Sequence, residues 1–450
     1  MSNSLTSIAA SGGVILTTLA LPAILSRLIT SAEYSLYATV MSVLPLLALV
    51  PQSLRTGAGS ALLSVYRERD VTSANQSFSH FVVLLIFFVL FSGLVLSELY
   101  IYIYDEGDLQ SNILRFGMYC IIVNVIGIAV ALIITGPAAA NNDFLPENTL
   151  KIFPPIIQLI GFFIIYIMSE SDKIYYVLIA SALNSWATLL VIVYLFRERT
   201  NSQDRKVEKI DDFSSGKVRN ALSSFHTAFQ LYGRLTASIS WWNLTAFLST
   251  TASVAIVAFF QPTKIVSFSI AMSVIGVISG GLIAISSPIA SKVATLGIDK
   301  ISLRKELFQK LNTIFIGYII FSSLFILLVP SVVFRIWVGD LYAEDVQYYV
   351  LLLLPAYCLR LLTMCFTVFI MSSGRQSTIW LSPAVESVVA TVGGLILIGV
   401  MGVEGIAVAL FVSSVVRILL TLMYDINLNS DVLPLSAGDI VLPKPKAFFR

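Results

Sequence analysis

Four ionisable side chains lie inside long apolar stretches of this sequence, where charged groups are normally excluded. They are Arg55, Arg360, Glu386 and Arg417. A charged group at the centre of a membrane helix costs at least about 2.5 to 3.5 kcal/mol, so each needs a partner or a hydrated cavity. A guanidinium is a planar fork of hydrogen-bond donors that suits phosphate groups. The set therefore predicts either an anion-binding cavity or ion pairs between helices.

Arg360 lies near the middle of its apolar stretch. It is twelve residues after Tyr348 and fifteen before Arg375, or about 18 and 22 Å along a helix axis. Snorkelling cannot bring its guanidinium to either interface, and Pro355 can kink the helix just before it. We interpret Arg360 as a cavity arginine that binds phosphate or sugar; the alternative is a tie to backbone carbonyls or to Glu386.

Glu386 and Arg417 lie at matched depths in consecutive apolar stretches. Glu386 is about nine residues inside the first stretch and Arg417 about seven inside the end of the second, both roughly 10 to 14 Å deep. This spacing predicts an ion pair, which need not be a functional site. Arg417 is nevertheless also a candidate for substrate binding. If Glu386 is unpaired instead, its carboxylate is a candidate for proton or sodium coupling.

Arg55 belongs to the stretch "LLALVPQSLRTGAGSALLSVYRERD", which interrupts its apolar character with Pro51, the arginine and two glycines. Counted from Leu36, Arg55 lies about 28 Å down a helix, in the cytoplasmic leaflet. Two interpretations remain open. The guanidinium either lines the cytoplasmic mouth of a cavity or anchors the helix to lipid phosphate.

The composition excludes a water-soluble globule. Hydrophobic residues make up 57% of the 450 residues, charged residues 12%, and the mean hydropathy is +0.88. Apolar runs long enough to cross about 30 Å of hydrocarbon recur along the whole chain. The predicted fold is an all-α polytopic membrane protein with twelve transmembrane helices, near residues 6–25, 35–65, 79–99, 114–135, 152–168, 174–196, 233–259, 266–290, 311–329, 347–372, 378–400 and 403–424.

The longest polar segment, 197–232, separates six predicted helices from six others. The expected organisation is an N-terminal bundle (1–196), a cytoplasmic linker (197–232), a C-terminal bundle (233–424) and a cytoplasmic tail (425–450). Twenty of the twenty-eight lysines and arginines fall in the segments on one side of the membrane. By the positive-inside rule, both termini are cytoplasmic.

Several functional classes find no support in the sequence. A net charge of +2 gives no reason to expect nucleic acid as a partner. The three cysteines have no CxxC spacing and no histidine cluster nearby, so neither a metal site nor a disulfide framework is predicted. No cofactor is expected. No DxD, HExxH, nucleophile elbow or phosphate loop is present. We therefore expect a protein that is not an enzyme, with a membrane glycan polymerase or ligase as the rival enzyme class.

Six short segments occur in an order typical of one transporter family. They are "PAILSRLITSAEYSLYA", "RTGAGSAL", "FFQPTKIVSFSIA", "IWVGDLYAEDV", "SSGRQ" and "MGVEGIAVA". In this ordered set the chain resembles the Wzx-type lipid-linked oligosaccharide flippases of the multidrug/oligosaccharidyl-lipid/polysaccharide exporter superfamily. Ser35 departs from the usual glycine. Ala252 and Ser253 stand where many relatives carry Asp-Arg, which puts in doubt an ion-coupling role at those positions.

The resemblance implies two six-helix bundles around a central cavity in the bacterial inner membrane. It implies transfer of undecaprenyl-pyrophosphate-linked oligosaccharide repeat units from the cytoplasmic to the periplasmic leaflet, for O-antigen or other surface polysaccharide of the lipopolysaccharide type. Alternating access is the expected mechanism. The implied partners are this lipid-linked oligosaccharide substrate, the lipid bilayer, and glycan polymerase or chain-length proteins.

A drug or cation antiporter of the same superfamily is the alternative transporter. A carboxylate in the first or seventh predicted helix would favour it. The first helix has none, and the seventh has none after Arg234. A cavity with arginines but few carboxylates suits an anionic headgroup better than an organic cation.

Overall fold

The computed structural model describes residues 2–52, 54, 62, 71–103, 108–140, 145–168, 173–203, 232, 240–241, 243–295, 300–373, 375 and 378–441. In this part of the chain all regular structure is helical. Nine of the described helices are long and apolar enough to cross a membrane: Asn75–Leu99, Ser111–Ala138, Lys173–Tyr194, Asn243–Phe260, Pro262–Leu282, Ile301–Leu328, Asp340–Ser372, Leu381–Met401 and Val403–Leu428. The all-α, multi-pass membrane architecture predicted from the sequence is confirmed.

The number of twelve helices stays a prediction. Two shorter apolar helices, Gly12–Leu28 and Ile152–Ile167, lie at the first and fifth predicted positions. The second predicted span, 35–65, extends beyond the residues that the structure describes. The cytoplasmic position of the two termini is likewise a prediction.

Packing divides the chain into two compact units. The C-terminal unit contains Leu244–Arg450 together with the first helix and part of the second, Met1–Ser42, and the N-terminal unit is Val43–Asn243. This grouping does not follow the boundaries 1–196 and 233–424, because the first helix packs on helices of the second half of the chain. The division by a cytoplasmic linker, which lies almost wholly outside the described residues, stays a prediction.

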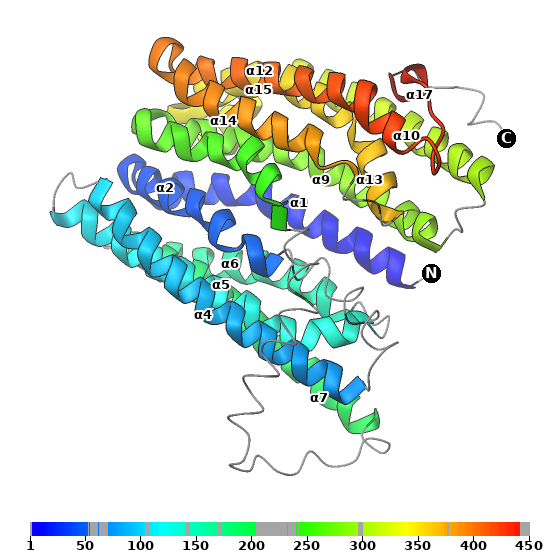
Figure 1. The fold of residues 1–450 in the computed structure, drawn as a ribbon. Coiled ribbons are helices and arrows are strands. Elements are labelled where there is room, and N and C mark those ends of the chain that lie inside the picture. Colours follow the sequence, from blue (N-terminus) through cyan, green and yellow to red (C-terminus); the bar gives the residue numbers. More distant parts are fainter. Residues whose placement is uncertain are drawn as a thin grey trace. The chain divides into compact units, whose positions relative to one another are not determined.

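The C-terminal unit is a bundle in which α14 packs along α15, α12 packs on α15 and α9, and α1 packs on α9 (Figure 1). Its helices are α1 (Ser2–Leu28), α2 (Ser31–Leu47, shared between the units), Asn243–Phe260, a 3₁₀ turn (Pro262–Lys264), α9 (Ile265–Thr295), α10 (Ile301–Leu328), α11 (Ser331–Val338), α12 (Asp340–Leu362), α13 (Met364–Ser372), α14 (Leu381–Met401), α15 (Val403–Leu420), a π-helical turn (Thr421–Asp425), α16 (Ile426–Leu428) and α17 (Ala437–Val441).

The end of α1 is tied to the short helix α11 by polar contacts. Arg27, in the last turn of α1, donates to the carbonyls of Trp337 (2.8 Å) and Ile336 (2.5 Å). The Trp337 indole in turn donates to the Leu19 carbonyl at 2.7 Å. A basic side chain at a helix C-terminus also complements the helix dipole. These bonds add to the packing of α1 on α9, which places the first helix in the C-terminal unit.

A tight turn at Gly402 joins α14 and α15 into an antiparallel hairpin. Its φ angle is +69°, and its N–H donates to the Ile398 carbonyl at 3.0 Å. Glycine reaches this left-handed region without the steric penalty that a Cβ brings. Glu386 lies sixteen residues before Gly402 and Arg417 fifteen after it, or about 24 and 22 Å of helix. The turn therefore sets these two side chains at the same level.

We expect Gly402→Ala to destabilise the protein by about 1 to 2 kcal/mol. Alanine would hold an unfavourable φ, and its Cβ would lie 3.0 Å from the Gln261 amide nitrogen. Gly399→Ala is the matched control, because a Cβ there meets nothing within 4 Å. Thermal unfolding of the purified variants in detergent measures the difference. Equal melting temperatures would show that the turn tolerates a side chain.

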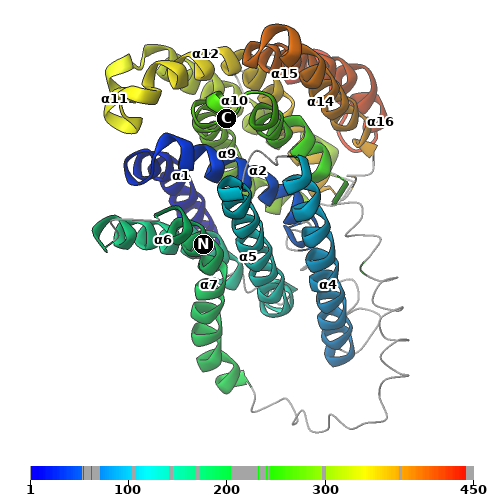
Figure 2. The ribbon, with the colours of Figure 1, turned by 90° about the vertical axis from the view of Figure 1, so that its left-hand side faces the viewer.

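The N-terminal unit contains α4 (Val71–Ile103), α5 (Asp108–Ala140), α6 (Leu145–Met168) and α7 (Lys173–Gln203), with α5 packed against both α4 and α7 (Figure 2). Buried amides and hydroxyls join α5, α6 and α7. Asn124 donates to Asn184 Oδ1 (3.1 Å) and accepts from Ser185 (2.7 Å), while Gln158 donates to Ser181 (2.9 Å). Because these buried polar groups are bonded to one another, they serve to hold the three helices together.

Candidate functional site

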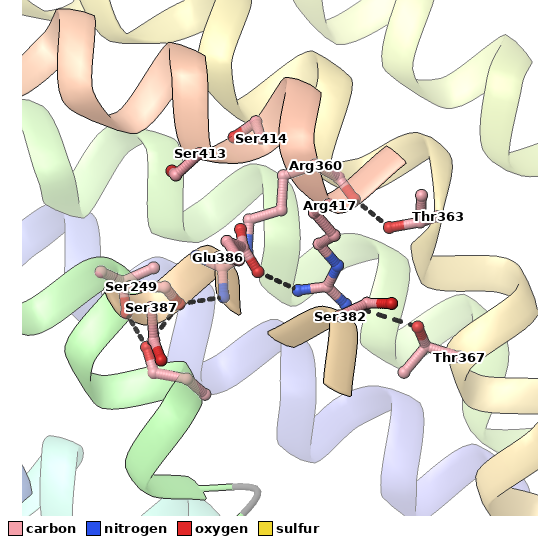
Figure 3. Close-up of polar contacts among 12 residues, drawn as sticks. Ser249, Arg360, Thr363, Thr367, Ser382, Glu386, Ser387, Ser413, Ser414 and Arg417 are labelled. Atoms are coloured by element: carbon pink, nitrogen blue, oxygen red, sulfur yellow. Dashed lines mark hydrogen bonds and ion pairs between the residues drawn. The ribbon is translucent and has the colours of Figure 1, made fainter. Parts of the chain in front are cut away.

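Three of the four charged residues singled out in the sequence meet in the C-terminal unit (Figure 3). Glu386 of α14 accepts a hydrogen bond from Arg417 of α15, with Nη1 and Oε2 2.5 Å apart. Its other oxygen, Oε1, lies 3.4 Å from Nε of Arg360 on α12. The predicted Glu386–Arg417 ion pair is confirmed. The contact between Arg360 and Glu386, considered as the alternative for Arg360, is also present.

Each member of this cluster is placed by its helix. The Gly402 turn places Glu386 and Arg417 at the same depth in their two helices. The helix that carries Arg360, α12, packs on α15. Arg360 belongs to the last turn of α12, which ends at Leu362. The helical path is interrupted at Thr363, whose hydroxyl donates to the Arg360 carbonyl at 3.0 Å. The sequence predicted a kink at Pro355, before Arg360. The helix α12 instead continues through Pro355, and the interruption comes after Arg360.

The cluster is mostly excluded from solvent, and its members differ in exposure. The side chains of Glu386 and Arg417 are 1% and 8% exposed, and that of Arg360 is 17% exposed. Both oxygens of Glu386 contact a guanidinium. The carboxylate is therefore paired in this structure, whereas a role in ion coupling was considered for an unpaired one. With all three groups ionised, the cluster carries a net charge of +1.

Arg360 has a donor group left over after its protein contacts. Its Nη2 donates to the Ser249 hydroxyl at 2.8 Å and its Nε faces Glu386. Its Nη1 has no partner among the described residues. Arg360 is far from both ends of the membrane span Asp340–Ser372, where a partly exposed guanidinium needs a hydrated space rather than lipid. The leftover donor is therefore available to a ligand in such a space.

Hydroxyl groups surround the three charges (Figure 3). The Thr367 hydroxyl accepts from Arg417 Nη2 at 3.4 Å. Other hydroxyls bond to carbonyls of their own helices: Ser387 to Ala384 at 2.8 Å, and Ser413 and Ser414 to Leu410 at 2.9 and 2.8 Å. The surroundings of the cluster are thus rich in hydroxyl groups, and the buried carboxylate of Asp425 also interacts electrostatically with Arg417.

The structure also adds two residues that the sequence reasoning missed. Ser249 orients Arg360, and Asp425 lies buried in the π-helical turn, where its Oδ2 accepts from Ser382 at 2.5 Å. The signal for Asp425 was a lone carboxylate eight residues after Arg417. It escaped notice because the last predicted helix ended at residue 424. Nothing in the sequence distinguished Ser249 as a site residue, because serines are common in apolar helices.

Arg55 lies outside the described residues, so the choice between a cavity mouth and a lipid anchor stays open. Among the residues that are described, no group of three or more His, Cys, Asp or Glu side chains is placed to hold a metal ion.

Comparisons with known proteins bear on the fold. No protein-family model and no curated protein sequence matches the chain. Among solved structures, "Lipid II flippase MurJ, inward closed conformation" is similar with a TM-score of 0.67 at 12% identity, covering 99% of this chain and 90% of that one.

Two further structures are similar over nearly their whole length. An inward-facing multidrug resistance MATE family transporter of the MOP superfamily matches with a TM-score of 0.63 at 14% identity, covering 94% of this chain and 95% of that one. A MOP superfamily transporter from Pyrococcus furiosus matches at 0.55 and 14%, covering 95% of both chains. At such identities the likeness concerns the fold. The chain therefore has the transporter fold that MurJ shares with MATE family transporters of the MOP superfamily.

Proposed function

We propose that this protein moves lipid-linked oligosaccharides with a pyrophosphate linkage across a membrane. The observation that carries the proposal is the partly exposed Arg360, which keeps one donor group, Nη1, without a protein partner among the described residues. Bidentate, charge-assisted hydrogen bonds make arginine well suited to phosphate oxygens. The transporter fold and the resemblance to Wzx-type flippases support the same conclusion.

The proposed mechanism is alternating access. Arg360 binds the pyrophosphate, the hydroxyl-rich surroundings accommodate the polar headgroup, and the polyprenyl tail stays in lipid. Carrying about two negative charges through a medium of low dielectric is costly, and nearby guanidiniums lower that cost. Arg417 contributes positive charge from a more buried position. Arg55 is retained as a proposed residue of the cytoplasmic entrance.

The finer assignment follows the family resemblance. We propose undecaprenyl-pyrophosphate-linked repeat units of O-antigen or another surface polysaccharide as the substrate, and the bacterial inner membrane as the location. Glycan polymerase or chain-length proteins are the proposed downstream partners. The division into two six-helix bundles with both termini in the cytoplasm is part of this proposal.

A drug or cation antiporter is the second candidate, and the similarity to MATE structures favours it. The electrostatics argue against it. A cluster with two guanidiniums and one carboxylate repels an organic cation and attracts an anion. A membrane glycan polymerase or ligase is the third candidate, but it has no catalytic motif in the sequence to support it.

Reconstitution in vesicles distinguishes the three candidates. Purified protein is placed in vesicles with a fluorescent pyrophosphate-linked oligosaccharide lipid, and its accessibility in the outer leaflet is followed by quenching. We expect protein-dependent movement of this lipid and no chemical change in it. Uptake of an organic cation without lipid movement would support the antiporter, and a longer glycan product would support the polymerase. Protein-free vesicles give the background rate.

A further inference from the structure

The two ion pairs of Glu386 are unequal. Its Oε2 lies 2.5 Å from Arg417, whereas its Oε1 lies 3.4 Å from Arg360. The closer pair is also the more buried one, with side-chain exposures of 1% and 8%, compared with 17% for Arg360. Coulomb attraction strengthens with shorter distance and with deeper burial. Glu386 is therefore held mainly by Arg417, and its contact with Arg360 is the weaker one.

The partners of Arg360 keep its guanidinium in place without saturating it. Nη2 is fixed by the Ser249 hydroxyl at 2.8 Å, Nε faces the carboxylate, and Nη1 is left over. Nε and Nη2 form one edge of the guanidinium, and Nη2 has a second hydrogen besides the one bonded to Ser249. A phosphate that binds side-on through Nε and Nη2 needs the position that Oε1 of Glu386 now occupies. Ligand and carboxylate thus compete for the same edge of one guanidinium.

We infer that Glu386 is an internal competitor for the anionic ligand, a positioning residue that limits affinity at Arg360 and promotes release. In the empty site its carboxylate takes the place of a phosphate oxygen. When phosphate binds, Oε1 withdraws from Arg360. The carboxylate stays paired with Arg417, so no buried charge is left without a counter-ion. On release, Oε1 returns to Arg360 and displaces the ligand. This inference rests on the proposed function.

The inference predicts effects of opposite sign on binding and transport. In Glu386→Gln, the amide oxygen can still accept from Arg417, while the amide NH₂ cannot pair with Arg360. We expect this variant to bind inorganic pyrophosphate about 10-fold more tightly, because one competing charge near the guanidinium is removed. Its transport rate should fall, because release is slower. A merely structural role for Glu386 predicts weaker binding instead.

Two further variants separate contact from charge. Glu386→Asp keeps the charge but has a shorter side chain, so it should retain the closer pair with Arg417 and lose the contact with Arg360. We expect it to bind pyrophosphate more tightly than the unsubstituted protein, and its retained ion pair keeps the test usable if Glu386→Gln folds poorly. Asp425→Asn is the control. It removes another buried carboxylate, one that bonds to Ser382 rather than to Arg360.

Calorimetric titration of the purified proteins in lipid nanodiscs with inorganic pyrophosphate, at one fixed ionic strength, measures the affinities. Tighter binding by both Glu386 variants and a smaller change in Asp425→Asn are the expected results. Unchanged or weaker binding by Glu386→Asp, or an equal gain in Asp425→Asn, overturns the inference and leaves the proposed function standing. If the unsubstituted protein shows no pyrophosphate binding that Arg360→Ala removes, the proposed function fails as well.

Discussion

Arg360→Ala is expected to lower transport of the proposed substrate, a lipid-linked oligosaccharide, by at least about 100-fold, because charge-assisted contacts to a desolvated phosphate contribute several kcal/mol. The variant loses the whole guanidinium, including the Nε that faces Glu386, whereas Glu386 keeps its closer partner Arg417. Protein abundance should therefore remain near normal. Glycan export by a flippase-deficient strain that expresses the variant measures the effect.

Two companions make this result interpretable. Arg360→Lys keeps the charge but lacks the planar donor fork, so we expect an intermediate rate. Arg335→Ala is the matched control. It removes an arginine whose ion pair with Glu344, at 3.1 Å, is largely exposed, and we expect normal export. Full export by Arg360→Ala at normal abundance would remove Arg360 from the proposed binding site.

Glu386→Ala is expected to cause the largest loss of stability, about 3 to 5 kcal/mol. It removes the carboxylate that contacts two guanidiniums, and the Arg417 side chain, which is 8% exposed, cannot recover solvation in water. Thermal unfolding of the purified protein, together with the yield of folded protein from membranes, measures the loss. Glu98→Ala is the control, because its pair with Arg115 (3.5 Å) is exposed and contributes less than about 1 kcal/mol.

The double variant Glu386→Met with Arg417→Met tests the physical reason. If the loss in Glu386→Ala comes from unpaired buried charge, removing both charges should restore much of the stability, since apolar replacement of a buried pair is often neutral. Arg360 retains Ser249 and partial exposure in that variant. A double variant as unstable as Glu386→Ala would mean that packing, rather than charge compensation, makes Glu386 indispensable.

Local sequence was enough to predict one contact of the site. Glu386 and Arg417 belong to consecutive helices joined by a short turn, so equal spacing from that turn places them at the same level. Gly402 makes the turn tight, with a φ of +69°. Any pair of antiparallel helices joined by this turn has Glu386 and Arg417 at the same depth. This contact therefore depends little on the rest of the fold.

The third member of the cluster could not be placed in the same way. Arg360 is twenty-six residues before Glu386, and α12 and α14 are not consecutive, since α13 lies between them. The depth of Arg360 in its helix was compatible with several partners, and Glu386 was one of them. Which helices become neighbours, and which face each presents, depends on side-chain packing that hydropathy does not encode. The same holds for Ser249, whose hydroxyl receives a bond from a residue 111 positions away.

The sequence by itself determined the all-α membrane architecture and the few charges within its apolar stretches, because insertion into lipid depends on local hydropathy and helix length. Only the tertiary structure decided that α1 packs with the second half of the chain, that Asp425 is buried in a π-helical turn, and that Arg360 shares Glu386 with Arg417. These depend on contacts between distant helices. A charge within an apolar stretch indicates that a partner is needed, but the packing of the helices determines which residue becomes that partner.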